Sequence, residues 1–469
     1  MTARTILSAM TVALAMASAS AKEPTKVQVW LDTEDYTWDR SNDAICEYAR
    51  ILAEEGIRGH FNLAGYLGRF WVEKGRKDVI EALKPHLVGT QTKYHSYHPT
   101  VCEYTDIADY DEAYRIALRE ESEGVGMLKA ALGDRKLMFS VMPGSSSSYV
   151  LLDAYADMDI PFFGGIGAID DDVEGNGHCY YQNQHHIFYN TGVCFDELRS
   201  DRCDKIDFDV LLDHAATKKL AVMYAHPHMA VRKRHWDIDN FLKGNNVEFG
   251  KWNPPEPLPA EETKRFFERF RAFLRRVKAD PRFVFTDCEE MLKAEKPRVK
   301  ITRADIPAIR ASLLKDFGPV SVPASWCVAD CFQAAVRLLR GDAEYIPGKV
   351  YGFLEKPVGV DRPVKVKAAD LKAAAMKISF RRHLPVSYDV GGAKIGPADF
   401  LFATLEVLDT GAEEVLVSPR EQLGDIAARF PKLARFNHCR PPSWVILWPK
   451  FKDQYLSDRL RWQYWTLRY

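Results

Sequence analysis

Short apolar runs alternate with amphipathic segments along the first 296 residues. Runs rich in Val, Leu, Ile and Phe predict strands, and segments with apolar positions three or four apart predict helices. The expected strands are 26–31, 59–63, 87–89, 137–141, 161–163, 220–225 and 283–286, and the expected helices are 42–55, 77–83, 149–158 and 261–278. This alternation predicts a parallel α/β sheet closed into a (β/α) barrel, since closure removes the sheet edges. Chemistry in such barrels lies where the strands end.

Two later regions break this alternation. Residues 237–259 lose periodicity and are rich in Asn, Gly and Pro, which predicts a long loop over one face of the barrel. Past residue 296, Ala-Asp pairs at 329–330, 369–370 and 398–399 each open a helical pattern, and the first two helices are followed by extended pieces containing Pro. We therefore expect a barrel domain over 22–296 and an accessory domain of two or three helix–extension units over 297–469.

Composition narrows the setting of the protein. Residues 1–21 combine Arg4, a small apolar stretch and the small residues 19–21, which is typical of a secretory signal. We therefore expect an exported protein, periplasmic or extracellular, and no segment is long and apolar enough for a membrane span. A net charge of −1 argues against a nucleic-acid partner. Nine cysteines predict a few disulfides beside buried thiols.

An acidic cluster follows the first strand, in the segment LDTEDY at 31–36. Asp32, Glu34 and Asp35 would repel one another unless a cation or a shared proton compensates their charge. Alternation along a strand would turn Asp32 and Glu34 to the same side. The other interpretation is a solvated acidic loop.

Two histidine segments follow at later strand ends. If 91–98 forms a turn of helix, Gln91, His95 and His98 share one face, and two imidazoles with a carboxylate suit a divalent metal. The strand at 220–225 ends at His226 and His228, where a histidine could protonate a leaving amine or could simply cap the strand.

These segments, in this order, resemble the motif series of the polysaccharide deacetylase family, also called carbohydrate esterase family 4. Residues 139–163, with Pro143 and Gly144, resemble the third-motif region of a bacterial subgroup, and the resemblance covers roughly 27–292. It implies a distorted seven-stranded (β/α) barrel. It also implies a metal cofactor, for which we expect Zn²⁺, with Co²⁺ or Ni²⁺ as alternatives. The site residues that it implies are Asp32 as catalytic base, Glu34 or Asp35 with His95 and His98 as metal ligands, and His226 as catalytic acid.

The chain departs from the family at two positions. Gln91 stands where the first histidine of the second motif is expected, and an amide is a poorer zinc ligand than an imidazole. No Arg stands at 142–144, where the family often has one that orients the catalytic base. Either Arg135 or Lys136 takes that role, or the activity is lost. We expect the substrate-binding residues to be Gln91, Tyr94, Pro143, Gly144, His228 and Trp252.

The resemblance implies removal of N-acetyl groups from a polysaccharide such as peptidoglycan or another exported glycan. Two alternatives remain open. One is an inactive relative that binds glycan through the same groove. The other is a wall-anchoring protein whose C-terminal module stacks on sugars through aromatic side chains, with Trp444, Trp448, Trp462 and Trp465 as candidates.

Overall fold

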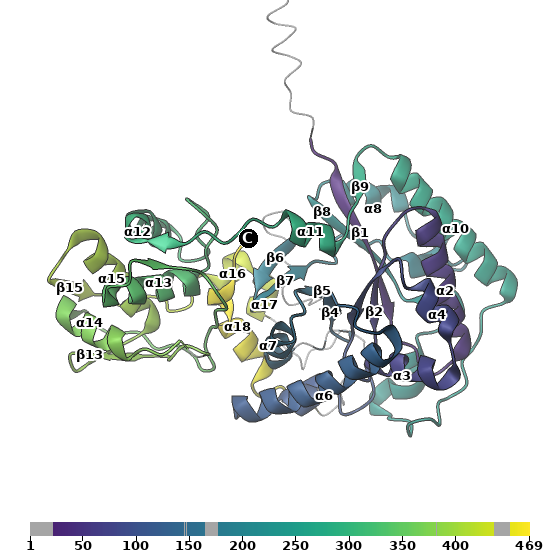
Figure 1. Ribbon diagram of the computed structural model, residues 1–469, viewed down its shortest axis with the longest axis horizontal. Helices are drawn as coiled ribbons and strands as arrows, with labels where there is room; N and C mark the ends of the chain where they lie inside the picture. Colours follow the sequence, from purple (N-terminus) through teal and green to yellow (C-terminus); the bar gives the residue numbers. More distant parts are fainter. Residues whose placement is uncertain (1–21, 145, 147, 165–176, 381, 436–450) are drawn as a thin grey trace, which may run out of the picture.

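The computed structural model describes residues 22–144, 146, 148–164, 177–380, 382–435 and 451–469. The expected signal segment 1–21, Trp444 and Trp448 lie outside these residues. Figure 1 shows a larger lobe, in which helices surround a sheet, beside a smaller lobe formed by later segments of the chain. Over the described residues, the helices are too short or too polar to cross a membrane.

The larger lobe is built on a sheet of nine strands, and all but one of its strand pairs are parallel. The order is β6-β7-β5-β4-β3-β2-β1-β8, and β9 also pairs with β1. The strands are β1 (Thr25–Thr33), β2 (His60–Leu63), β3 (Leu87–Thr90), β4 (Phe139–Val141), β5 (Phe162–Gly164), β6 (His178–Tyr181), β7 (Gln184–Ile187), β8 (Leu220–Ala225) and β9 (Phe283–Phe285). All seven strands expected from the sequence are present.

A seven-stranded closed barrel is not confirmed. The unexpected hairpin β6–β7 extends one edge, and its turn places Gln182 and Asn183 at positive φ, as tight hairpin turns require. In the described part of the chain no strand pair joins β6 to β8. The edge strand β8 instead meets the segment after β7 at a single bridge, where the Tyr224 N–H donates to the Val193 carbonyl at 3.1 Å.

The helices of the larger lobe include the four that the sequence predicts, namely α2 (Asp39–Glu54), α4 (Lys77–Ala82), α7 (Tyr149–Asp157) and α10 (Ala260–Ala279). Six further helices are α3 (Gly65–Lys74), α5 (Val101–Thr105), α6 (Tyr110–Leu132), α8 (Phe208–Ala215), α9 (Trp236–Phe241) and α11 (Cys288–Ala294). The predicted loop 237–259 therefore begins inside a helix, α9. The remainder runs without regular structure to α10, apart from a 3₁₀ turn at Leu242–Gly244.

The smaller lobe has its own apolar core. Its helices α12 (Ile306–Lys315), α13 (Val328–Arg340), α14 (Ala368–Lys377) and α15 (Pro397–Thr410) pack with short antiparallel pairs. These pairs join β10 (Ile301–Thr302) to β11 (Glu344–Tyr345), β12 (Val364–Lys367) to β15 (Glu414–Val417), and β13 (Tyr388–Val390) to β14 (Ala393–Ile395). Helices α13, α14 and α15 each begin one residue before an Ala-Asp pair, and a strand follows each.

The C-terminal segment belongs to both lobes. Helices α16 (Ile426–Arg429), α17 (Pro431–Arg435) and α18 (Leu456–Trp462) lie between them in Figure 1. Leu456, Leu460 and Leu467 are buried in the core of the larger lobe, whereas Trp465 is buried in the core of the smaller one. The division at 296/297 stays a prediction, and the tail ties the two parts together.

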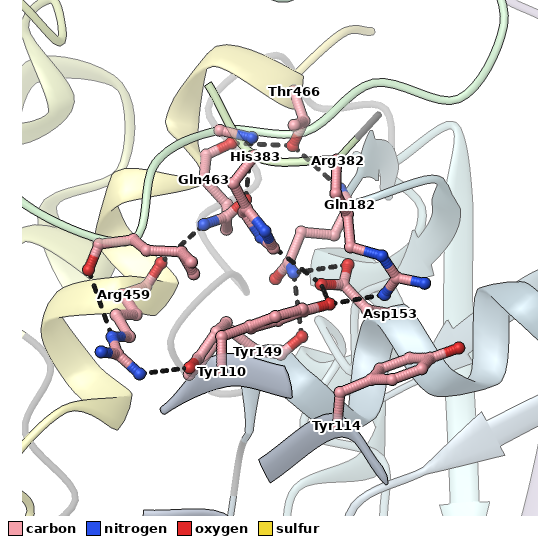
Figure 2. Close-up of polar contacts among 12 residues, drawn as sticks. Tyr110, Tyr114, Tyr149, Asp153, Gln182, Arg382, His383, Arg459, Gln463 and Thr466 are labelled. Atoms are coloured by element: carbon pink, nitrogen blue, oxygen red, sulfur yellow. Dashed lines mark hydrogen bonds and ion pairs between the residues drawn. The ribbon is translucent and has the colours of Figure 1, made fainter. Parts of the chain in front are cut away.

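A polar cluster joins the lobes beside α7 (Figure 2). Tyr110 Oη donates to Asp153 Oδ2 at 2.8 Å, and Arg382 Nη1 of the smaller lobe donates to Tyr110 Oη at 2.7 Å. From α18, Arg459 Nη1 donates to Tyr149 Oη at 2.7 Å. Side chains from three segments distant in sequence thus share one buried network.

The expected disulfides are not found among the described residues. The eight cysteines there are free thiols, including Cys194 and Cys203 and the buried pair Cys327 and Cys331. Cys327 instead caps α13, where its Sγ accepts the Asp330 N–H at 3.3 Å.

Candidate active site

The acidic cluster lies buried where β1 ends. Asp32 is 6% exposed and accepts hydrogen bonds from Asn62 Nδ2 at 2.7 Å and from Tyr189 Oη at 3.3 Å. Burial raises the pKa of Asp32 to about 6, and the neighbouring Glu34 adds to the rise while His226 opposes it. A carboxylate with such a pKa can take up and release a proton near neutral pH.

Glu34 lies against the second histidine segment. His95 Nε2 is 2.8 Å from Glu34 Oε2, and Trp236 Nε1 donates to Glu34 Oε1 at 3.1 Å. Burial alone would raise the pKa of Glu34, but the His95 ring outweighs it and lowers that pKa below its usual value. The same contact raises the pKa of His95, against the effect of burial.

Asp35 has a different set of partners. Its Oδ2 accepts Arg232 Nη1 at 2.6 Å, and its Oδ1 accepts the hydroxyl of Thr37 at 2.6 Å. Arg232 is fully buried and also pairs with Asp239 at 2.9 Å. Of the two acids between which the sequence leaves the ligand open, Glu34 is the one that meets histidine.

His226 faces Asp32 from the end of β8. Its Nε2 is 3.7 Å from Asp32 Oδ2, and its Nδ1 is 2.7 Å from Asp196 Oδ2. Burial lowers the pKa of His226, but the Asp196 carboxylate outweighs burial and raises that pKa well above its usual value. Asp196 was not singled out from the sequence, because it lies on a 3₁₀ turn (Phe195–Leu198) with no local motif.

The second histidine segment is not helical. Residues 91–98 form turns and bends in which Thr92 and His95 have positive φ, so the one-face arrangement of Gln91, His95 and His98 is wrong. The His98 ring pairs with Glu103 at 2.7 Å rather than with Glu34. Gln91 is buried, and within the described part of the chain its Oε1 has no hydrogen-bond partner.

Three residues after β8 complete the surroundings of Glu34. Ligand atoms of Glu34, His228 and His235 lie within 4.8 Å of one another, as do those of Glu34, His95 and Asp237. Carboxylates and imidazoles in this arrangement suit a divalent metal. No sequence pattern marks Asp237 as a site residue, because it stands at the start of a predicted loop.

Two of the remaining expected site residues are aromatic. Tyr94 and Trp252 belong to a cluster of aromatic rings with Tyr36, Tyr97 and Phe249. A cavity of about 340 Å³ next to this cluster is lined by residues that include Tyr94, His95 and His98.

Among the described residues, no hydrogen bond or ion pair joins the expected third-motif residues to Asp32. Pro143 accepts the Ser146 N–H through its carbonyl, and Gly144 is exposed. Arg135 donates to the carbonyls of Leu83 and His86, and Lys136 pairs with Asp159. Asn62 and Tyr189 orient Asp32 instead.

Comparison with known proteins gives structural matches only. No family model matches the chain, and no curated protein matches it significantly. A carbohydrate esterase family 4 pseudoenzyme mutant with restored activity, whose wild type is from Bacillus anthracis, is 13% identical, with 60% of this chain and 71% of that chain covered and a TM-score of 0.32.

Two esterases of the same family are similar to the chain at comparable levels. The esterase of Streptococcus mutans is 12% identical, with 56% of this chain and 85% of that chain covered and a TM-score of 0.30. A family 4 carbohydrate esterase from Bacillus anthracis is 12% identical, with 58% and 84% covered and a TM-score of 0.30. The family that the motifs resemble is thus also the family of these structures, and the comparisons add no site residue to those described above.

Proposed function

We propose that the protein is a metal-dependent hydrolase that removes N-acetyl groups from an exported or cell-wall polysaccharide. The observation that carries this proposal is that His226 Nε2 lies 3.7 Å from Asp32 Oδ2, beside the Glu34–His95 pair. A carboxylate base, an imidazole acid and a metal-ligating pair at one place are groups with which metal-dependent amide hydrolysis can proceed.

The residues present fit a divalent cation. Glu34 and His95 are both buried, and His95 Nε2 lies 2.8 Å from Glu34 Oε2. We propose that this pair holds the ion. The chemistry that such an ion supplies is polarisation of the acetamide carbonyl and a lower pKa of the attacking water.

Proton transfers follow from the chain's own residues. Asp32, held by Asn62, takes the proton of the attacking water, since its pKa of about 6 leaves it ionised at neutral pH. His226, kept protonated by Asp196, donates to the departing amine nitrogen as the C–N bond breaks. The products are acetate and a free amino sugar.

A second candidate function is glycan binding without turnover. The observation that favours it is Gln91, which occupies the place of an imidazole ligand and lies buried with its Oε1 unpartnered. The wall-anchoring alternative has less support, because Trp465 is fully buried and Trp462 packs against the same core. Those two rings are therefore core residues and not a sugar platform.

Acetate release tests the hydrolase. Chain 22–469, loaded with Zn²⁺, is assayed on N-acetylated peptidoglycan and chitin oligomers beside Asp32→Asn and His226→Gln. Each variant should lose about 100-fold or more in kcat/KM, because each removes a proton-transfer group. His214→Gln, which changes an exposed histidine on α8, is the matched control and should keep wild-type activity. Glycan binding without acetate release by the loaded wild type would favour the second candidate.

A further inference from the structure

Asp237 is a buried carboxylate with few partners. It lies in the first turn of α9 and is 2% exposed. In the described part of the chain its side chain receives one hydrogen bond, from the N–H of the adjacent Ile238 at 2.9 Å. A buried carboxylate normally has a cation or several donors around it, because burying an unpaired charge is unfavourable.

The neighbours of Asp237 add to this deficit. One oxygen of Asp237, one of Glu34 and a ring nitrogen of His95 lie within 4.8 Å of one another, and all three residues are buried. Two carboxylates at this separation repel, and a single protonated imidazole compensates only one of them. Trp236 Nε1 donates to Glu34 and brings no positive charge. A divalent cation between the three side chains would balance the charge of both carboxylates.

We propose that Glu34, His95 and Asp237 together hold the divalent ion, with Asp237 supplying the third protein ligand in place of the imidazole that Gln91 lacks. This inference rests on the proposed function, whose metal site it completes. The helix α9 thereby supplies a ligand from the segment after β8. Two carboxylates and one imidazole form a harder donor set than one carboxylate and two imidazoles, so that Mn²⁺ should compete better with Zn²⁺ here.

The second possible group at Glu34 is less in need of an ion. His228 Nε2 and His235 Nδ1 are 3.2 Å apart and hydrogen-bond to each other. Among the described residues His228 Nδ1 has no hydrogen-bond partner, but two neutral imidazoles carry no negative charge that an ion would have to balance. Asp237 and Glu34 do carry such a charge, and electrostatics therefore favours the group with His95.

Metal titration of the full mature chain tests the ligand set without substrate. Metal-free wild type, Asp237→Asn and His235→Gln are titrated with Zn²⁺ and with Mn²⁺ against a competing chelator, and the visible spectrum of the Co²⁺ form is recorded. Removing a residue that only hydrogen-bonds to a metal ligand costs about 10 to 100-fold in affinity, so loss of the ligand Asp237 should cost about 100-fold or more. His235→Gln should stay within about 10-fold of wild type and keep the wild-type Co²⁺ spectrum.

Thermal unfolding of the metal-free proteins separates ligation from a folding role. Asp237→Asn keeps the size of the side chain and removes one of two facing charges, so its metal-free form should melt at or above the wild-type temperature. A lower melting temperature, wild-type affinity in Asp237→Asn, or a loss confined to His235→Gln would each overturn the ligand set. A wild type that binds none of these ions overturns it together with the proposed function. A wild type that binds metal but releases no acetate overturns the function alone.

Discussion

At the residue scale, the surroundings of each carboxylate after β1 determine its role. Glu34 meets a histidine and a tryptophan N–H, whereas its neighbour Asp35 meets the fully buried guanidinium of Arg232. Adjacent residues on an extended segment point in opposite directions, so two acids side by side in sequence reach different partners. Glu34 is thereby placed at the proposed metal site. Asp35 instead holds the segment that follows β8, through Arg232.

Asp35→Asn should therefore lower the free energy of unfolding without weakening metal binding. The change leaves Arg232 buried with Asp239 as its remaining acidic partner, and breaking a buried ion pair costs about 3 kcal/mol or more. Urea unfolding measures the loss, and a Zn²⁺ titration of the same variant checks the affinity. Glu34→Gln is the matched variant and should weaken Zn²⁺ binding. Weaker Zn²⁺ binding in Asp35→Asn would place Asp35 among the ligands.

At the element scale, α3 and α6 approach each other closely at glycines. A Cβ on Gly65 would lie 2.7 Å from the Cα of Gly124, and one on Gly68 would lie 2.3 Å from the Met127 carbonyl oxygen. Helix α3 follows β2 directly, and its first backbone N–H, that of Gly65, donates to the carbonyl of Thr92 at 2.8 Å. This packing thus also supports the turn segment that carries His95.

Gly68→Ala should be destabilising, by about 1–3 kcal/mol, because the added methyl group meets backbone atoms that cannot move aside. Gly126→Ala on α6 is the matched control. A Cβ there meets nothing within 4 Å, and alanine in a helix interior should raise stability by about 0.5–1 kcal/mol. Chemical denaturation of both variants measures the two free energies. Equal effects in the two variants would contradict the close approach.

The same elements show what the sequence could predict. Apolar runs identified seven of the eight strands that form parallel pairs, because buried strands need continuous apolar residues. They missed β7, whose sequence QHHI is mostly polar. Helices α3 and α6 were missed, since glycine and alanine stand where larger apolar residues would mark a buried face. The bend at His95 was interpreted as helix, because its positive φ depends on contacts distant in sequence. Asp196 and Asp237 were missed for the same reason, as their partners come from other strands.

At the scale of the whole molecule, the two lobes are joined through a buried carboxylate. Asp153 on α7 accepts hydrogen bonds from Tyr110 and, at 3.2 Å, from Gln182 Nε2 (Figure 2). From the smaller lobe, His383 Nε2 lies 3.6 Å from its Oδ2, and Arg382 reaches the cluster through Tyr110. Burial raises the pKa of Asp153 to about 7, while the Tyr110 hydrogen bond and the Arg382 charge oppose the rise.

This pKa makes the stability of the junction depend on pH. Between about pH 4 and pH 7 the folded protein keeps a proton on Asp153 that the unfolded chain has lost, so the stabilisation is full below pH 4 and disappears as the pH rises to 7. The difference in unfolding free energy between wild type and Asp153→Asn should therefore fall over that window and stay constant above it. Because His383 is present in both proteins, its own titration cancels to first order in this difference.

Urea unfolding of wild type and Asp153→Asn at intervals from pH 4 to pH 8 measures this dependence. Asp159→Asn, at an exposed position just after α7, is the matched control, and its stability should run parallel to that of wild type at every pH. The asparagine at 153 can still accept from Tyr110 and Gln182, so a parallel curve for Asp153→Asn as well would mean that Asp153 stays ionised at the junction. In that case the charge of Arg382, rather than a proton, would compensate that of Asp153, because burial lowers the pKa of His383 to about 3 and keeps its ring neutral from pH 4 to pH 8.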